Sequence, residues 1–175
     1  MANKLCFFIF GLCFLPALAM AARPVKNPFI VHGKVFCDTC RAGFETYATT
    51  YVPGIASFLL CLPCFGAKVR VECRDSKSLQ VVYNIDGVTD STGTYQIQVA
   101  DDHGDQLCES VLLSSPERDC ATIQPGRDRA RVILTNNNGI VSNYRYANSL
   151  GFVKDAPLAG CEQVLKQYQE HEEQV

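Results

Sequence analysis

Eight cysteines in residues 23–175 limit what this chain can fold into more than any other feature of its sequence. The full sequence of 175 residues contains ten cysteines, of which Cys6 and Cys13 lie in an apolar N-terminal segment. The remaining eight are Cys37, Cys40, Cys61, Cys64, Cys73, Cys108, Cys120 and Cys161. An even set of thiols forms disulfides in an oxidising compartment, whereas the same spacings indicate metal binding or catalysis in a reducing one. The destination of the chain therefore decides what these cysteines do.

The N-terminal segment has the three parts of a secretory signal peptide. Lys4 supplies a positive charge, an apolar run occupies residues 5–15, and small residues follow up to Ala22. The apolar run is shorter than the roughly 20 residues that a membrane-spanning helix needs. We therefore predict a signal peptide at residues 1–22 and a mature chain of residues 23–175. We expect that chain to be secreted to the extracellular space, with no membrane association after cleavage.

The balance of charges argues against nucleic acid as a partner. The sequence has 16 Lys and Arg against 18 Asp and Glu, a net charge of −2, whereas non-specific binding to nucleic acid needs a basic excess. A mature chain of about 150 residues can bury an adequate core as one domain. We therefore expect a single domain over residues 23–175 and no nucleic-acid partner, while the oligomeric state stays open.

Two Cys-x-x-Cys pairs, Cys37 with Cys40 and Cys61 with Cys64, are the strongest competing signal. Four thiolates in this pattern are typical of a structural zinc site. The predicted export and the apolar residues around Cys61 favour disulfides instead. A thioredoxin-like motif would need a βαβ unit beside the pair, and the flanking segments do not supply one. We therefore predict disulfides and no metal.

Short alternating segments separated by turn residues predict an all-β fold. In residues 67–73 the apolar side chains lie on one face and the charged ones on the other. We expect strands at 30–37, 67–73, 79–83, 95–99, 108–113 and 130–135, a strand at 140–146 that returns antiparallel to its predecessor, and a helix at 161–170. The fold class is a disulfide-stapled antiparallel β-barrel or sandwich of about seven strands with a short C-terminal helix.

No pattern of residues indicates catalysis. The chain has three histidines, and it contains no nucleophile elbow, HExxH motif or phosphate-binding loop. Asp101, Asp102, His103 and Asp105 cluster in one turn but miss the spacing of a calcium loop. A solvated turn is the better interpretation, so we predict no catalytic residues and no cofactor.

Residues 32–41, HGKVFCDTCR, resemble the signature of the olive-pollen-allergen-type (Ole e 1-like) family of secreted plant proteins. The similarity continues through residues 68–73 (KVRVEC), 89–95 (TDSTGTY) and 150–152 (LGF) and covers nearly all of the mature chain. The signature residues in this sequence are Gly33, Val35, Cys37, Asp38, Cys40 and Arg41.

The resemblance implies six framework cysteines. Family pairing would join Cys37 to Cys120, Cys40 to Cys161 and Cys73 to Cys108, whereas local pairing of Cys37 with Cys40 is the alternative and would close a very small loop. Disulfides that close long loops stabilise more than those that close short ones in the chain-entropy model.

The resemblance also implies a function without catalysis. It points to an extracellular protein of the plant apoplast that binds a receptor ectodomain or a cell-wall component in pollen-tube or wall growth, and it implies frequent allergenicity. A small-ligand carrier within the barrel is the alternative, and a secreted hydrolase is a weaker one. Rigid β-scaffolds commonly present function on exposed loops, which makes residues 101–106 and 136–139 candidates for recognition.

Residues 55–65 (IASFLLCLPCF) depart from the family pattern, because similar proteins run directly from Pro-Gly into the strand at 67–73. We interpret the segment as an apolar insertion that is dispensable for the fold. Its Cys61 and Cys64 either bond to each other or form the least stable pair. Its apolar side chains either fold back over the barrel or form an exposed patch.

Overall fold

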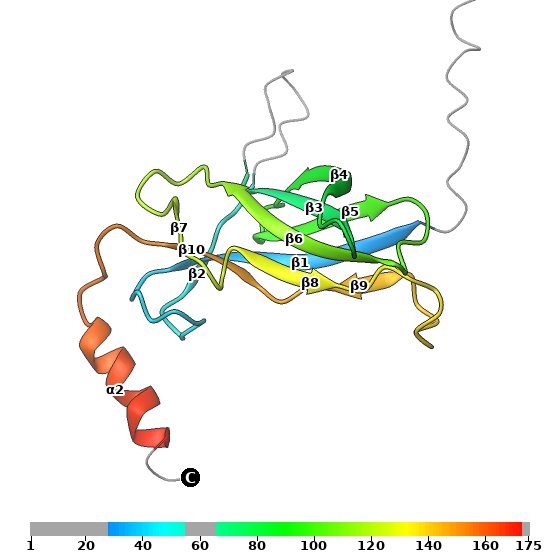
Figure 1. The fold of residues 1–175 in the computed structure, drawn as a ribbon. Coiled ribbons are helices and arrows are strands. Elements are labelled where there is room, and N and C mark those ends of the chain that lie inside the picture. The colour runs from blue at the N-terminus through cyan, green and yellow to red at the C-terminus, as the bar shows by residue number, and fades with distance from the viewer. Residues whose placement is uncertain (1–27, 55–65, 173–175) are drawn as a thin grey trace, which may run out of the picture.

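The computed structural model describes residues 28–54 and 66–172, so the predicted signal peptide and the predicted insertion at 55–65 lie outside the described residues. Within these described residues nearly all of the regular structure is β, with one helix at the C-terminal end (Figure 1). The elements are β1 (Phe29–Asp38), β2 (Thr50–Tyr51), β3 (Lys68–Asp75), β4 (Val81–Val88), β5 (Thr94–Val99), β6 (Gln106–Ser114), β7 (Thr122–Ile123), β8 (Arg129–Val132), β9 (Tyr144–Tyr146), β10 (Leu150–Val153) and α2 (Cys161–Glu172).

Strand β1 organises one of the two sheets, because it changes its neighbours halfway along its length. Its first half pairs antiparallel with β5 and parallel with β9. Its second half pairs antiparallel with β2 and parallel with β10, and β7 joins the far edge of β10. The N-terminal strand of the described fold is therefore central rather than peripheral.

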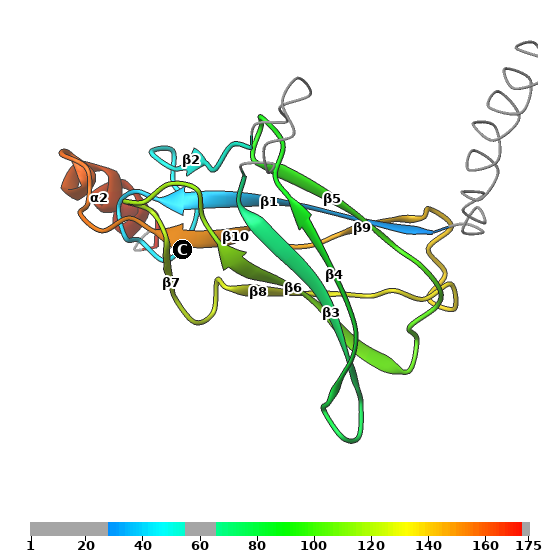
Figure 2. The ribbon, with the colours of Figure 1, turned by 90° about the horizontal axis from the view of Figure 1, so that it is seen from above.

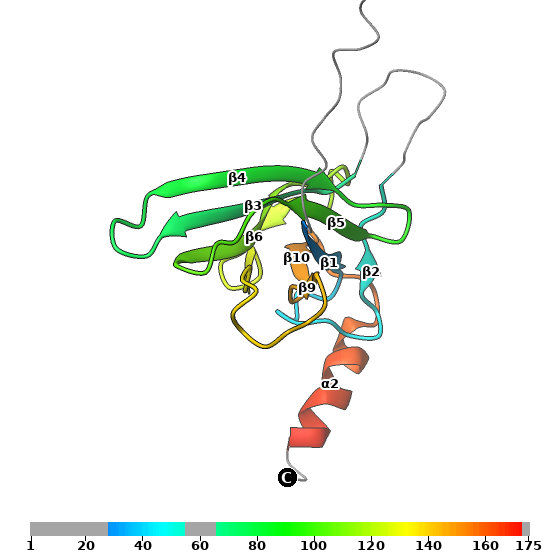
Figure 3. The same cartoon turned by 90° about the vertical axis from the view of Figure 1, so that its right-hand side faces the viewer.

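The second sheet is antiparallel and has the order β4-β3-β6-β8. Strand β3 alternates as its sequence predicts, with Val69, Val71 and Cys73 fully buried and Lys68 exposed. The two sheets face each other, and Figure 3 shows β4, β3 and β6 lying over β1, β9 and β10. Figure 2 shows the turn between β3 and β4 projecting beyond the sandwich.

Apolar side chains from both sheets fill the space between them. The largest fully buried ones include Tyr95, Phe29 and Phe152. Gly87 on β4 lies so close to β5 that a Cβ there would be 2.6 Å from Ile97. The architecture is thus a packed sandwich and not a closed barrel, which resolves the two forms of the predicted fold class and confirms its β content and terminal helix.

Helix α2 stands apart from the main core, as Figures 1 and 3 show. It packs through Cys161 and Val164 against Cys40 in a second, smaller cluster. The ring of Tyr168 also meets the ring of Phe44 edge to face, with centroids 5.1 Å apart. Most of the contact between the helix and the sandwich therefore passes through the segment that follows β1.

Three disulfides join Cys37 to Cys120, Cys40 to Cys161 and Cys73 to Cys108. These are the pairs that the family resemblance implies, and they exclude local pairing of Cys37 with Cys40. The first two bridges start from Cys37 near the end of β1 and from Cys40 just after it, and they go to different partners, a late turn and the first residue of α2. The end of β1 is thereby tied to two distant parts of the chain.

One strand prediction is wrong. Residues 140–146 do not form a hairpin with the strand before them: only Tyr144–Tyr146 are extended, and they pair parallel with β1 in the other sheet. The predicted turn exists, with Gly139 at φ +78°. A turn reverses the chain direction but does not determine which strand the next segment pairs with. Here the chain crosses from one sheet to the other and pairs with β1. Strand 79–83 also begins later and runs further, at Val81–Val88.

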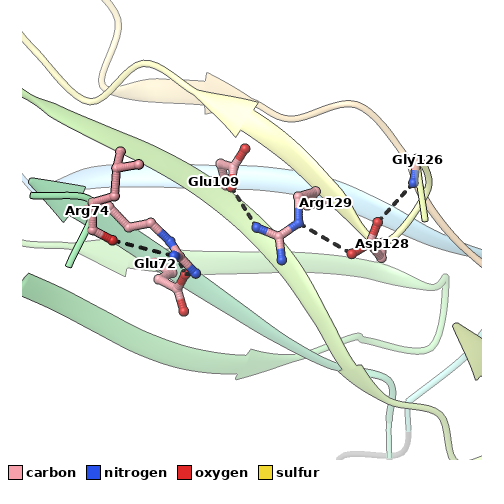
Figure 4. Close-up of polar contacts among 7 residues, drawn as sticks. Glu72, Arg74, Glu109, Gly126, Asp128 and Arg129 are labelled. Atoms are coloured by element: carbon pink, nitrogen blue, oxygen red, sulfur yellow. Dashed lines mark hydrogen bonds and ion pairs between the residues drawn. The ribbon is translucent and has the colours of Figure 1, made fainter. Parts of the chain in front are cut away.

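The outer face of the four-stranded sheet carries a network of ion pairs, shown in Figure 4. Glu72 and Glu109 lie directly opposite each other on β3 and β6, an unfavourable arrangement for two carboxylates. Arg74 contacts Glu72 at 2.6 Å, and Arg129 contacts Glu109 at 2.9 Å and Asp128 at 3.3 Å. The two arginines compensate the like charges, so this face is a balanced polar surface.

Candidate functional site

The Cys-x-x-Cys signature forms a tight corner at the end of β1. The buried carboxylate of Asp38 accepts hydrogen bonds from the backbone N–H groups of Ala42 (3.0 Å) and Gly43 (2.7 Å). Arg41 adopts a left-handed backbone conformation at φ +54°, and its guanidinium donates to the carbonyl of Asp155 at 3.0 Å. Both polar signature residues therefore hold the corner that carries the two disulfides.

The other signature residues belong to the core. Val35 is fully buried, and Gly33 lies under the ring of Tyr95, where a Cβ would come within 2.3 Å of the tyrosine Oη. No other side chain fits between these strands without movement of the ring. The six signature residues thus stabilise the fold, and Arg41 also lines a hollow beside α2 together with Phe44 and Tyr168.

The two loops predicted as recognition candidates lie side by side. The carboxylate of Asp102 accepts hydrogen bonds from the backbone N–H of Asn136 (2.8 Å) and from the hydroxyl of Thr135 (3.1 Å). The N–H of Asn136 is the largest cause that lowers the pKa of Asp102. The aspartate therefore joins residues 101–106 to residues 136–139, although the sequence indicates only a solvated turn.

His103 points inward and not into that turn. Its side chain is buried, and its ring nitrogens lie 3.0 Å from Gln106 Oε1 and 3.0 Å from the carbonyl of Ala100. The ring also packs on Tyr83, with centroids 4.7 Å apart. With both nitrogens engaged, the imidazole does not join Asp101 and Asp105 as a cation ligand.

Two clusters in the described residues bring three possible metal ligands together. One contains Cys73, His103 and Cys108, and the other contains Cys37, Glu117 and Cys120. In each cluster the two sulfurs are bonded to each other, and a metal site needs thiolates. Cys37 and Cys40, one half of the zinc pattern, are also in disulfides, with Cys120 and Cys161. Cys61 and Cys64, the other half, lie outside the described residues.

A groove beside β9 was not predicted from the sequence. It has a volume of about 390 Å³ and a largely apolar wall. We call it the tyrosine groove and define it by Ile133, Ile140, Tyr144 and Tyr146, with Arg131 and Ser142 as its polar members. The alternation in Tyr144-Arg145-Tyr146 is the signal that indicates it, because both tyrosines must then leave the same face of a strand.

The buried side chain of Arg145 holds this groove together. Its guanidinium donates to the carbonyls of Ile133 (3.0 Å), Thr135 (3.0 Å) and Tyr144 (3.1 Å), and also to that of Ser142. It lies 4.7 Å from the centroid of the Phe29 ring. One cation therefore fixes the backbone of the long crossing between β8 and β9.

Comparison with known proteins gives the family. The model of the family described as Pollen protein Ole e 1 like matches residues 27–169. The chain belongs to the Ole e 1-like family. Pollen-specific protein C13 of Zea mays is 44% identical over 159 residues, which cover 91% of this chain and 86% of the maize protein.

Two further proteins are similar to most of this chain. Pollen allergen Phl p 11 of Phleum pratense is 41% identical over 145 residues, 82% of this chain and 93% of the allergen. The crystal structure of the major plantain pollen allergen Pla l 1 matches with a TM-score of 0.63 and 27% identity, over 77% of this chain and 99% of that one. The resemblance read from the sequence is thus confirmed. Among the described residues, no helix is long and apolar enough to cross a membrane.

Proposed function

We propose that this Ole e 1-like protein is secreted and acts without catalysis, by binding a receptor ectodomain or a cell-wall component in pollen-tube or wall growth. The relatives named above are called pollen-specific proteins and pollen allergens, not enzymes. The N-terminal signal-like segment and the three disulfides support export, because disulfides form and persist in oxidising compartments.

The packed interior is the observation that carries this proposal. Tyr95, Phe29 and Phe152 occupy the space between the sheets, so a ligand of the kind a lipocalin-like barrel encloses has no room there. The hollows of the described chain, such as the tyrosine groove, are open to solvent. Recognition therefore takes place on the outer surface, and we do not propose a carrier within a barrel.

A pull-down with the disulfide-intact mature protein tests the proposal. The protein is immobilised through its C-terminus and exposed to pollen or apoplast extract, and retained proteins and polysaccharides are identified. Protein that has been reduced and alkylated is the matched control, because it has the same sequence without the fold. Retention of a receptor ectodomain or wall component by the folded form alone supports the proposal. Equal retention by both forms, or turnover of a substrate in a hydrolase screen, would overturn it.

A further inference from the structure

We propose that the tyrosine groove binds a proline-rich polypeptide segment in the polyproline II conformation. This inference rests on the proposed function, because it names the chemical class of the wall component. Extended proline-rich segments dock into grooves lined by exposed aromatic side chains, and they do so at low entropic cost because they are already ordered.

The groove presents preformed aromatic surface. Tyr146 is 73% exposed and Tyr144 is 43% exposed, and their rings are nearly parallel, at 22° with centroids 6.5 Å apart. The ring of His32 contacts that of Tyr146 edge to face at 5.3 Å. Ile133 and Ile140 add two more exposed apolar side chains. An exposed apolar surface of this kind marks an interaction site.

The hydrogen bonds of Arg145 decide what such a ligand must lack. Its guanidinium already uses the carbonyls of Ile133, Thr135, Ser142 and Tyr144 around the groove, and the carbonyl of Asn143 accepts from the N–H of Ile30 at 2.9 Å. A ligand with backbone N–H groups would find these carbonyls already engaged, and only hydroxyls would remain to accept from it. Polyproline has no backbone N–H at all.

The polar side chains of the groove offer donors instead. Arg131 is exposed, donates only, and has no ion-pair partner within the described part of the chain. Its cross-strand neighbour Glu109 is engaged by Arg129. The hydroxyls of Ser142, Tyr144 and Tyr146 can also donate. A polyproline II helix makes no internal hydrogen bonds and so leaves its carbonyls free to accept.

A neutral polysaccharide fits less well. Its hydroxyl groups are donors as well as acceptors, and some of them would be buried against Ile133 and Ile140 without partners. Unpaired polar groups are costly in such surroundings. The chemistry of the groove therefore favours the ligand that is apolar and accepts hydrogen bonds without donating them.

Fluorescence anisotropy with fluorescein-labelled decaproline and the disulfide-intact mature protein tests the inference. We expect saturable binding, and no binding of a Gly-Ser peptide of the same length. Tyr146→Ala should weaken binding at least about tenfold, as truncation of an aromatic anchor does. Tyr47→Ala is the matched control, because Tyr47 is also an exposed tyrosine (64%) but precedes β2 near the other end of β1. It should change binding by less than about twofold.

Three results would overturn the inference: no binding of decaproline to the wild-type protein, equal effects of the two tyrosine variants, or binding of cellohexaose but not of decaproline. The result also separates this inference from the proposed function. If the pull-down retains a partner equally well with wild type and Tyr146→Ala, the groove is not the site and the proposed function stands. If decaproline binds while the pull-down retains no partner, the groove binds polyproline and the proposed function fails.

Discussion

Gly33 and Tyr95 lie directly opposite each other on β1 and β5, and the tyrosine ring occupies the place of the missing side chain. A Cβ at position 33 would lie 2.3 Å from Tyr95 Oη and 2.5 Å from Cζ. The family signature requires glycine here because a large, fully buried ring crosses the strand.

Replacing Gly33 with alanine should therefore destabilise the fold by about 1–3 kcal/mol, the usual cost of overpacking a core. Chemical denaturation of Gly33→Ala measures it. A Gly33→Ala midpoint equal to that of wild type would show that the ring has another place to go.

The guanidinium of Arg145 should matter for stability, because it donates to four backbone carbonyls. Arg145→Met leaves the four carbonyls without their shared donor, and we expect a loss of about 3 kcal/mol. Arg131→Met removes an exposed arginine nearby and should cost at most about 0.5 kcal/mol. Thermal unfolding followed by circular dichroism compares the two, and similar midpoints would contradict the role of Arg145.

The disulfide between Cys73 and Cys108 joins directly opposed residues of β3 and β6, with Cα atoms 4.0 Å apart. Cys73→Ser should cost on the order of 2–5 kcal/mol, as removal of a native disulfide from a small secreted domain does. The variant should contain one new reactive thiol, at Cys108. Thiol labelling and peptide mapping locate it, and a label on Cys120 instead would refute the pairing.

The burial of Tyr95 should make the protein less stable at alkaline pH. Burial raises the pKa of Tyr95 from 10.0 to about 12, so the unfolded chain releases its proton first. Stability should be unaffected by this group below pH 10 and should fall between pH 10 and 12, by up to about 3 kcal/mol. Urea unfolding across this range measures the slope. Tyr95→Phe should flatten it, and an unchanged slope in that variant would exclude Tyr95 as the cause.

Deleting residues 55–65 should leave the β spectrum and the thermal midpoint nearly unchanged. The flanking residues already meet, since a Cβ on Gly66 would lie 3.1 Å from the Cα of Gly54. Thr89 holds both sides through its hydroxyl, which donates to the carbonyl of Val52 (3.0 Å) and accepts from the N–H of Ala67 (3.0 Å). A deletion variant that does not fold would place the segment in the core and Cys61 or Cys64 in the framework.

Local patterns in the sequence predict β3 and β6 of the second sheet well, because alternation reports which face of a strand is buried. The residues at 67–73 show this clearly in β3. Strand β4 has no buried face, and its position is displaced from the predicted one. The partner of β9 could not be predicted in the same way. It depends on hydrogen bonds from Arg145 to residues as far back as Ile133, and such contacts leave no periodic trace in the sequence.

For the candidate sites too, the sequence shows local features but not contacts between distant segments. The family resemblance was enough to name the signature residues and the cysteine pairs. Their roles in the corner after β1 and in the core became visible only in the structure. The sequence indicates only a solvated turn at Asp102, because Asn136, which donates a hydrogen bond to it, lies in a loop that is distant along the chain. The tyrosine groove likewise combines β8, β9 and the crossing between them, so no single segment reveals it.

The crossed bridges from Cys37 and Cys40 also decide what happens when a protease cuts the chain. Any single cut between residues 40 and 161 leaves two pieces joined through Cys40 and Cys161, and a cut between residues 37 and 40 leaves them joined through Cys37 and Cys120. One nick in an exposed loop therefore releases no fragment from this region. A protein nicked once between residues 37 and 161 stays one covalent molecule, and only reduction or a second cut separates its parts.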